Sequence, residues 1–272
     1  MTTDQLGWQL DVHGAREYER NLVTLFMDDW ARDLVARANV RPGQAVLDVG
    51  TGTGIVARHA LGAVGPTGSV DAIDINPAML EVARSLSAQA LPRPTFHHGA
   101  AEDLPFDDDL FDVVTAQHVL QFTDPAPALT EFRRVARSGA RLAVATCRSL
   151  AHQPGYRLLV EGLAEHLGAD AADIISSPYA LGESAELIDL VLGNGFQDVR
   201  TAIAVTSTRF PSATAFLQAE SSSSPLGDVT ESLEPTRLAA LTDDLDRRLD
   251  PHTDSDGIVF PFETIVVTAT AA

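Results

Sequence analysis

The chain has 272 residues, of which 45% are hydrophobic, and its 38 acidic and 19 basic side chains give a formal net charge of −19. This composition is typical of a globular protein with one large domain, or one domain and a smaller appendage. The acidic balance argues against nucleic acids and anionic membrane surfaces as partners, because both are bound through clustered lysine and arginine. The single cysteine, Cys147, excludes an internal disulfide and any metal site with several thiolates.

No targeting or membrane segment is visible in the sequence. The first ten residues, MTTDQLGWQL, contain neither the basic nor the apolar region of a secretory signal. No apolar run reaches the roughly 18 residues that a membrane-spanning helix needs. We therefore expect a cytoplasmic protein with a small-molecule partner, and either a monomer or a homodimer.

The first predicted element is a long helix over residues 16–38. Apolar side chains recur there at every fourth position, at Tyr18, Leu22, Phe26, Trp30 and Leu34. Apolar β-rich runs then predict strands at residues 46–49, 68–75, 95–98, 111–116 and 141–147. Helical patterns lie between them at residues 54–62, from Asn76-Pro77 onward with Asn76 as N-cap, and at 126–137. This alternation is typical of a parallel sheet covered by helices on both faces.

The pattern is looser after residue 150. We expect helices at residues 155–168, 183–195 and 235–249, a strand at 196–208, a flexible loop at 221–225 and a closing edge strand at 262–271. The helical segments at residues 16–38, 155–180 and 212–250 are too many to cover one sheet. We expect some of them to form a lid over the carboxyl edge of the sheet.

The most informative stretch is VLDVGTGTG at residues 46–54, a strand that enters a glycine-rich turn before a helix. Such a turn brings backbone N–H groups and a helix N-terminus close to a ligand. Gly52, Gly54 and Ala57 also fit the loose G-x-G-x-x-A pattern of dinucleotide sites. Asp48 disfavours that interpretation, because a carboxylate before the turn would repel a pyrophosphate. A ligand with positive charge and no phosphate, such as S-adenosylmethionine, is favoured instead.

A second acid, Asp74, ends the next strand about 20 residues after the turn. A carboxylate at this position accepts hydrogen bonds from both hydroxyls of a ribose. Because NAD and S-adenosylmethionine sites share this spacing, Asp74 indicates a ribose without choosing between them. Ile75 and Met79 would then lie beside the adenine, although Met79 could equally be an ordinary core residue.

With these residues in place, the sequence resembles the class I S-adenosylmethionine-dependent methyltransferases, and most of all the small-molecule group of the ubiquinone/menaquinone-biosynthesis type. The resemblance covers residues 40–150 through four motifs in order: VLDVGTGTG, VDAIDINPAMLEVAR, HGAAEDLPF with FDVVTAQHVLQF, and EFRRVARSGARLAVA. It implies an α/β fold with a doubly wound, seven-stranded, mostly parallel, Rossmann-like sheet and helical lid elements. The last strand of that sheet runs antiparallel, and residues 262–271 are similar to it.

The resemblance also implies roles for individual residues. The methionine part of the cofactor would face Gly50, Thr51, Gly52 and Thr53, with Asp48 near its ammonium group, Gln117 along that arm and Tyr18 closing over it. Asp74 would hold the ribose, the backbone N–H of Ala101 would bind the adenine, and Glu102 would border the adenine pocket. Two departures stand out: Ala100 replaces an Asp or Asn of many relatives, and ARSGARL lacks the usual proline-glycine-glycine turn.

Other candidate groups carry weaker signals. His118 lies past a strand at the carboxyl edge and could act as a general base, or it could merely shape the pocket. His13 could reach the pocket from the first helix. No histidine pair has metal-ligand spacing, the acidic run at residues 107–109 lacks the pattern of a calcium loop, and Cys147 is expected to be buried and inert. Five aromatic residues could line an apolar substrate cavity or belong to the core: Phe122, Tyr156, Phe210, Phe216 and Phe260.

The sequence thus predicts a methyltransferase that transfers the methyl group of S-adenosylmethionine to O, N or C of a small, apolar metabolite. Residues 1–39 would form a helical lid, residues 40–150 the cofactor-binding half, and residues 151–272 the substrate-side helices and closing strands. An isomerase or cyclase that binds S-adenosylmethionine without methyl transfer is the first alternative. An NAD(P)-dependent reductase is the second, and Asp48 together with the lack of a Tyr-x-x-x-Lys pair disfavours it.

Overall fold

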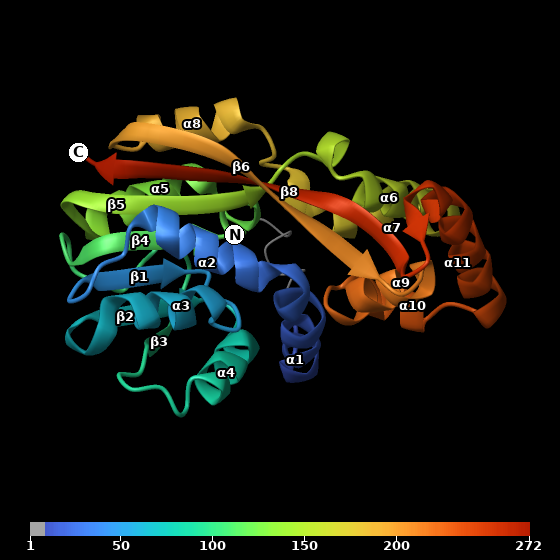
Figure 1. Ribbon diagram of the computed structural model, residues 1–272, viewed down its shortest axis with the longest axis horizontal. Coiled ribbons are helices and arrows are strands. Elements are labelled where there is room, and N and C mark those ends of the chain that lie inside the picture. The colour runs from blue at the N-terminus through green and yellow to red at the C-terminus, as the bar shows by residue number, and fades with distance from the viewer. Residues whose placement is uncertain (1–8) are drawn as a thin grey trace.

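A single mixed sheet organises the molecule (Figure 1). The computed structural model describes residues 9–272, except for the side chain of Phe26. The strands follow the order β3-β2-β1-β4-β5-β8-β6, and the short β7 pairs with β8. The pairs among the first five strands are parallel, whereas β8 runs antiparallel to both of its neighbours. The strands are β1 (Ala45–Val49), β2 (Ser69–Asp74), β3 (Thr95–His98), β4 (Phe111–Gln117), β5 (Ala136–Cys147), β6 (Phe196–Phe210), β7 (Thr253–Asp254) and β8 (Gly257–Ala271).

The predicted position of residues 262–271 at the edge of the sheet is wrong, although their antiparallel direction is confirmed. They belong to β8, which lies between β5 and β6, and residues 264–269 are buried on both faces. The strand at the edge is β6, along which exposed and half-buried residues alternate and Val205 is 61% exposed. A continuous apolar run such as IVV indicates burial on both faces, which an interior strand needs.

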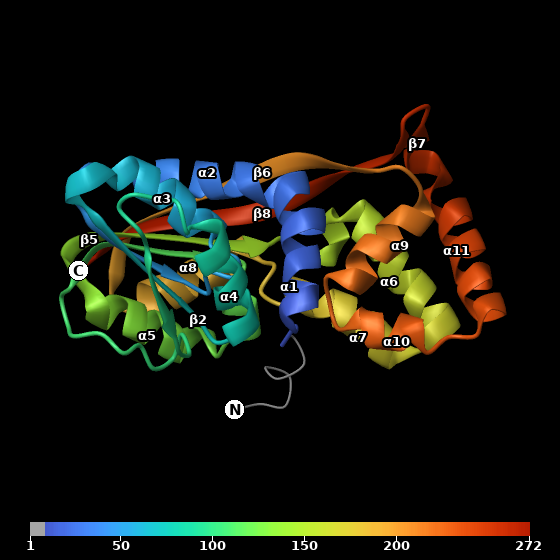
Figure 2. The same cartoon turned by 90° about the horizontal axis from the view of Figure 1, so that it is seen from below.

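Helices cover both faces of the sheet (Figure 2). α2 and α3 pack on one face, and α5 and α8 on the other, each pair with its own buried cluster. The α-helices are α1 (Val12–Tyr18), α2 (Asp28–Ala38), α3 (Ile55–Val64), α4 (Pro77–Leu86), α5 (Pro125–Val135), α6 (Pro154–Leu167), α7 (Ala169–Ser176), α8 (Ser184–Gly193), α9 (Ala213–Ser222), α10 (Leu226–Glu231) and α11 (Pro235–Leu249). Short 3-10 turns are η2 (Gly65–Thr67), η3 (Leu120–Phe122), η4 (Leu150–His152), η5 (Ser177–Tyr179) and η6 (Asp250–His252). The predicted doubly wound fold is therefore confirmed.

The long N-terminal helix connects two parts of the core. It runs from α1 through a π-helical segment, η1 (Glu19–Met27), into α2, so it begins four residues earlier than predicted. Leu34 packs in the cluster beneath α2 and α3, whereas Leu22 and Trp30 pack in a separate cluster. π-Helical turns are frequent at functional sites. Leu22 and Met27 of this segment line a cavity at the carboxyl edge of the sheet.

The separate cluster belongs to a helical region at the far end of β6 and β8. Both strands have 15 residues and extend as a ribbon beyond the parallel sheet toward α6, α7, α9 and α11 (Figure 1). The prediction of a loop at residues 221–225 is wrong for Ser221 and Ser222, which end α9, whereas residues 223–225 do form a turn, in which both serines are buried. Ser224 Oγ donates to the carbonyl oxygen of Glu220 at 2.6 Å, which fixes the turn. Within residues 9–272, no helix combines the length and the apolarity needed to cross a bilayer.

Candidate active site

The glycine turn lies between β1 and α3 in a conformation that favours glycine. Gly50, Gly52 and Gly54 have φ angles of +62°, +54° and +87°. The turn is fixed to β2, since the Thr51 N–H donates to the carbonyl of Ile73 at 3.0 Å. A Cβ built on Gly52 would meet no atom within 4 Å, so this side of the turn faces open space. The backbone is thus preformed and open to a closely approaching ligand.

Asp48 lies beneath the turn and is 1% exposed. Its carboxylate accepts hydrogen bonds from the hydroxyls of Thr51, at 2.6 Å, and Thr115, at 2.9 Å. Burial raises the pKa of Asp48 to about 7. No arginine or histidine of the described residues bonds to this carboxylate, so its charge stays uncompensated inside the protein. A cationic ligand group placed near it would supply the missing charge.

Asp74 closes the turn from the neighbouring strand. One carboxylate oxygen accepts the N–H of Gly52 at 2.7 Å, and the other accepts the N–H of Asn76 at 2.8 Å. Burial raises the pKa of Asp74 as well. Two carboxylate oxygens offer about four acceptor positions, and these two bonds use only half of them. The remaining positions suit a ligand diol, as the sequence predicts for a ribose.

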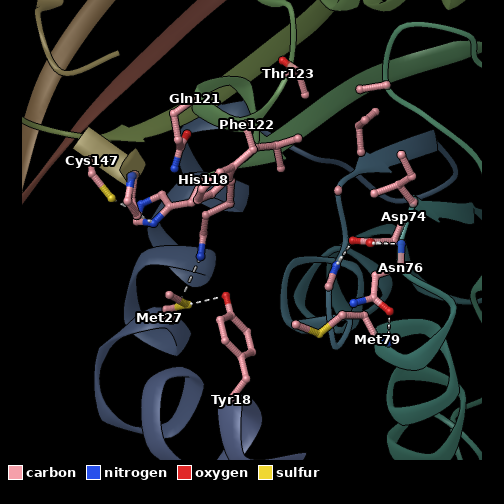
Figure 3. A pocket seen from close by; sticks show the side chains of 18 of the residues that line it. Tyr18, Met27, Asp74, Asn76, Met79, His118, Gln121, Phe122, Thr123 and Cys147 are labelled. Carbon is pink, nitrogen blue, oxygen red and sulfur yellow. Dashed lines mark hydrogen bonds between the residues drawn. The ribbon is translucent and has the colours of Figure 1, made fainter. Parts of the chain in front are cut away.

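A cavity opens at this edge of the sheet. Asp74, Asn76 and Met79 lie on one side, and Tyr18, Met27 and His118 lie across the space (Figure 3). Ten of the predicted site residues line this cavity: Tyr18, Gly50, Gly52, Asp74, Ile75, Met79, Ala101, Glu102, Gln117 and His118. The other three, Asp48, Thr51 and Thr53, line a smaller adjoining cavity that shares Tyr18, Gly50, Gly52 and Gln117 with the large one. The predicted residues are thus brought together, and their individual roles stay predictions.

Several predicted polar groups have partners inside the protein. The Thr51 hydroxyl donates to Asp48, and the Thr53 hydroxyl donates to Glu19, which also pairs with Arg58 at 2.8 Å. The bond from Thr53 to Glu19 ties the turn to η1. By contrast, Oε1 of Gln117 is buried and has no hydrogen-bond partner among the described residues. An unpaired buried acceptor at the rim of a cavity is a natural contact for a ligand donor.

His118 follows β4 in a left-handed backbone conformation with φ +56°, which is unusual for a residue other than glycine. Its ring contacts Cys147 Sγ at 3.6 Å and Thr264 Oγ1 at 3.4 Å, beside Trp30. Burial lowers the pKa of His118 to about 4, so the ring is neutral at physiological pH. It is a weaker proton acceptor than an ordinary histidine, although its role as a base stays a prediction. His13 is exposed on α1 and does not line the cavity.

The far end of the cavity contains residues that sequence reasoning missed. Glu220 from α9, Tyr179 from η5 and Phe262 from β8 line it together with Tyr156 from α6, which was predicted. Phe122 also lines the cavity as predicted. For Phe210, Phe216 and Phe260 the other alternative holds, because all three are buried in the core of the helical region and do not line the cavity. Glu220 lies in a stretch without any motif, so no local signal could have identified it.

The charge state of Asp48 predicts a measurable effect on stability. Since the folded protein binds a proton at Asp48 up to about pH 7 and the unfolded chain only to about pH 4, stability falls as pH rises between these values. We therefore expect Asp48→Asn to stabilise the ligand-free protein at pH 8, by about 1–3 kcal/mol, and much less at pH 4. Urea unfolding at both pH values measures this.

Asp112 provides the matched control, because its substitution should change the stability in the opposite direction. Its carboxylate accepts the N–H of Ala45 at 2.8 Å and bonds to Arg137, and these hydrogen bonds outweigh burial and lower the pKa of Asp112. Asp112→Asn should therefore destabilise the protein at pH 8. Equal effects of the two substitutions at pH 8 would contradict the account of Asp48.

The chain matches known proteins in the region of this site. A family profile described as methyltransferase domain matches residues 47–144. The ubiquinone/menaquinone biosynthesis C-methyltransferase UbiE of Burkholderia mallei is 44% identical over 117 residues, which are 42% of this chain and 48% of that protein. The chain thus spans about half the length of this curated relative. The predicted resemblance to the class I methyltransferases is confirmed over residues 47–144.

Solved structures match over most of the chain. The YcgJ protein from Bacillus subtilis is similar with a TM-score of 0.61 and 19% identity, covering 89% of this chain and 98% of that one. The [4+2]-cyclase SpnF is similar with a TM-score of 0.54 and 18% identity, covering 90% of this chain and 80% of that one. At such identities the likeness shows the fold alone, and it extends to the region after residue 150.

Proposed function

We propose that the protein transfers the methyl group of S-adenosylmethionine to a small, apolar metabolite, because residues 47–144 match a methyltransferase domain. The observation that carries the proposal is the uncompensated Asp48 beneath an open glycine turn, with Asp74 at the end of the next strand. A cation and a ribose diol are the two ligand features that these acids select.

The residues around the cavity fit this cofactor. Asp74 would accept the ribose hydroxyls, and Ile75 and Met79 would contact the adenine, whose edge would meet the backbone N–H of Ala101 beside Glu102. The turn at residues 50–53 would face the methionine part, near Asp48, with Gln117 and Tyr18 along its side. The open space above Gly52 and the unpaired Oε1 of Gln117 support this fit. When bound, the cofactor supplies an electrophilic methyl group on a sulfonium leaving group.

At the proposed cofactor end, the residues of this chain hold and align the reactants rather than transfer protons. The cavity is closed on one side by η1 and α1, where the Tyr18 hydroxyl donates to Met27 Sδ at 3.0 Å. Holding two reactants in line inside a cavity that excludes water supplies a large share of the rate for a displacement of this kind. The far walls are mostly aromatic and apolar, with Phe122, Tyr179 and Phe262, which supports an apolar acceptor.

Isothermal titration calorimetry tests the proposed cofactor. We expect S-adenosylmethionine and S-adenosylhomocysteine to bind with one site per chain, and NADH not to bind, because its pyrophosphate would meet Asp48 and Asp74. Binding of NADH without binding of S-adenosylmethionine would refute the proposal. Release of S-adenosylhomocysteine in step with the methylated product then tests the reaction itself.

A cyclase or isomerase that uses the bound cofactor only for its charge is the second candidate. The likeness to SpnF shows that a cyclase shares this fold. The two candidates differ in stoichiometry, because methyl transfer consumes one cofactor for each product. Product formation without release of S-adenosylhomocysteine would favour the cyclase.

A further inference from the structure

Glu220 places a buried carboxylate at the aromatic end of the cavity, away from the residues of the cofactor motifs. It projects from α9 and is 5% exposed. The Tyr156 hydroxyl donates to its Oε1 at 2.7 Å. Among the residues that the structure describes, no other group bonds to this carboxylate. Glu220 lines the cavity, and its second carboxylate oxygen accepts no hydrogen bond from the described residues.

No positive charge in the described part of the chain compensates Glu220. The groups that face it are the phenols of Tyr156 (α6), Tyr179 (η5) and Tyr18 (α1), and the thiol of Cys147 (β5). Burial raises the pKa of each of these four groups, and the pKa of His118 in the same cavity is lowered to about 4. All five therefore stay neutral between pH 6 and 8. A carboxylate in such surroundings is costly unless a ligand brings a cation.

The rings around the carboxylate suit the same kind of ligand. The ring centroid of Tyr156 lies 5.7 Å from that of Tyr179 and 5.1 Å from that of Phe262. Aromatic rings attract an ammonium group through their negative faces, and a desolvated site strengthens this attraction. An acidic group combined with aromatic walls is therefore complementary to an amine on an apolar skeleton, and less so to a neutral alcohol.

We propose that Glu220 binds the methyl acceptor as an apolar amine and receives the proton that its nitrogen loses before methylation. This inference rests on the proposed function and names the acceptor class for it. The ammonium group pairs with the carboxylate and transfers one proton to it, which leaves a nitrogen lone pair. The C–N bond then forms as the C–S bond breaks, and the electron pair of that bond stays on the sulfur. The product nitrogen carries the positive charge, opposite a now neutral Glu220.

The acceptor and the cofactor can be bound in the same cavity, and Glu220 can take up the proton there. Tyr18 lines the same cavity as Asp74 and Glu220. The residues proposed to bind the cofactor and those proposed to bind the acceptor thus line one continuous cavity. Burial raises the pKa of Glu220 to about 7, which suits a group that takes and returns a proton near neutral pH.

The test compares amines with alcohols of the same skeleton. The probes are 2-phenylethylamine, tryptamine and hexylamine, each paired with its alcohol, titrated into protein saturated with S-adenosylhomocysteine. We expect at least one amine to bind more than tenfold tighter than its alcohol at pH 8. This preference should shrink at pH 6, because Glu220 is then protonated.

Three variants separate the carboxylate from general effects on the fold. Glu220→Gln keeps the shape and should lose the preference, whereas Tyr156→Phe keeps the carboxylate and should retain most of it. Glu231→Gln, an exposed acid on α10, is the control and should behave as the wild type. Binding of S-adenosylmethionine should be unchanged in all three.

The outcomes are distinct. If no amine binds more tightly than its alcohol, or if Glu220→Gln keeps the preference, the acceptor assignment is wrong while the cofactor proposal stands. If neither S-adenosylmethionine nor S-adenosylhomocysteine binds to the wild type, the proposed function itself fails. Methylation of an alcohol but not of its amine would also overturn the assignment.

Discussion

Replacing Asp74 with alanine is expected to weaken S-adenosylmethionine binding by about 1–3 kcal/mol, because the two charge-assisted bonds that we propose between Asp74 and the ribose would be lost. The substitution also leaves the N–H groups of Gly52 and Asn76 without their acceptor, so the turn loses an anchor. Calorimetric titration of the folded variant measures the loss. Asp74→Asn keeps one carbonyl acceptor and should lose less.

Asp71 on the same strand is the matched control. Its carboxylate contacts His97 at 2.8 Å on β3 and does not line the cavity. Asp71→Ala should therefore leave the dissociation constant unchanged. An unchanged constant for Asp74→Ala as well would show that the ribose is not held at this position, even if the cofactor binds.

The second large effect is expected for Gly50→Ala. A Cβ at this position would lie 2.7 Å from Cγ1 of Val119 and closer still to its Cγ2, and the φ angle of +62° adds backbone strain. We expect a loss of stability of about 2–4 kcal/mol from the overpacking and the strain together. Cofactor binding should fall with it, because the turn has to move. Urea unfolding and calorimetry measure the two effects.

Gly52→Ala separates strain from overpacking. Its φ angle of +54° is similar, but an added Cβ meets no atom within 4 Å. This variant should lose only about 1–2 kcal/mol of stability, yet it should bind the cofactor poorly because the methyl group occupies the ligand side. Adding Val119→Ala to Gly50→Ala should restore part of the stability. Equal losses for the two glycine variants, with no rescue, would refute the packing argument.

Asp48 and Glu220 are two of the buried carboxylates of the described structure that bond to no arginine or histidine, and both line cavities at the same end of the sheet. Asp48 adjoins the proposed methionine arm, and Glu220 adjoins the proposed acceptor. Each reduces the stability of the free protein above about pH 4, since burial raises both pKa values to about 7. Such costly charges are typical of functional sites, and their placement fits two cationic ligand groups in adjoining cavities.

The sequence by itself determined the cofactor half of the molecule. Hydrophobic periodicity located the strands and helices. The spacing of Asp48, the glycine turn and Asp74 along the chain predicted that all three lie at one edge of the sheet. This works because consecutive parallel strands end at the same edge, so a local pattern already implies their proximity. The N-cap at Asn76 was readable for a similar reason, since capping depends on neighbours in the chain.

Only the tertiary structure decided the rest. It inserted β8 between β5 and β6, and it brought Glu220, Tyr156 and Phe262 to one cavity from separate parts of the chain. It also set the charge states, because burial lowers the pKa of His118 and raises that of Glu220. Local patterns encode which element forms, whereas burial depends on everything that packs around a residue. Desolvation, and with it the chemistry of the acceptor end, is therefore a property of the assembled fold.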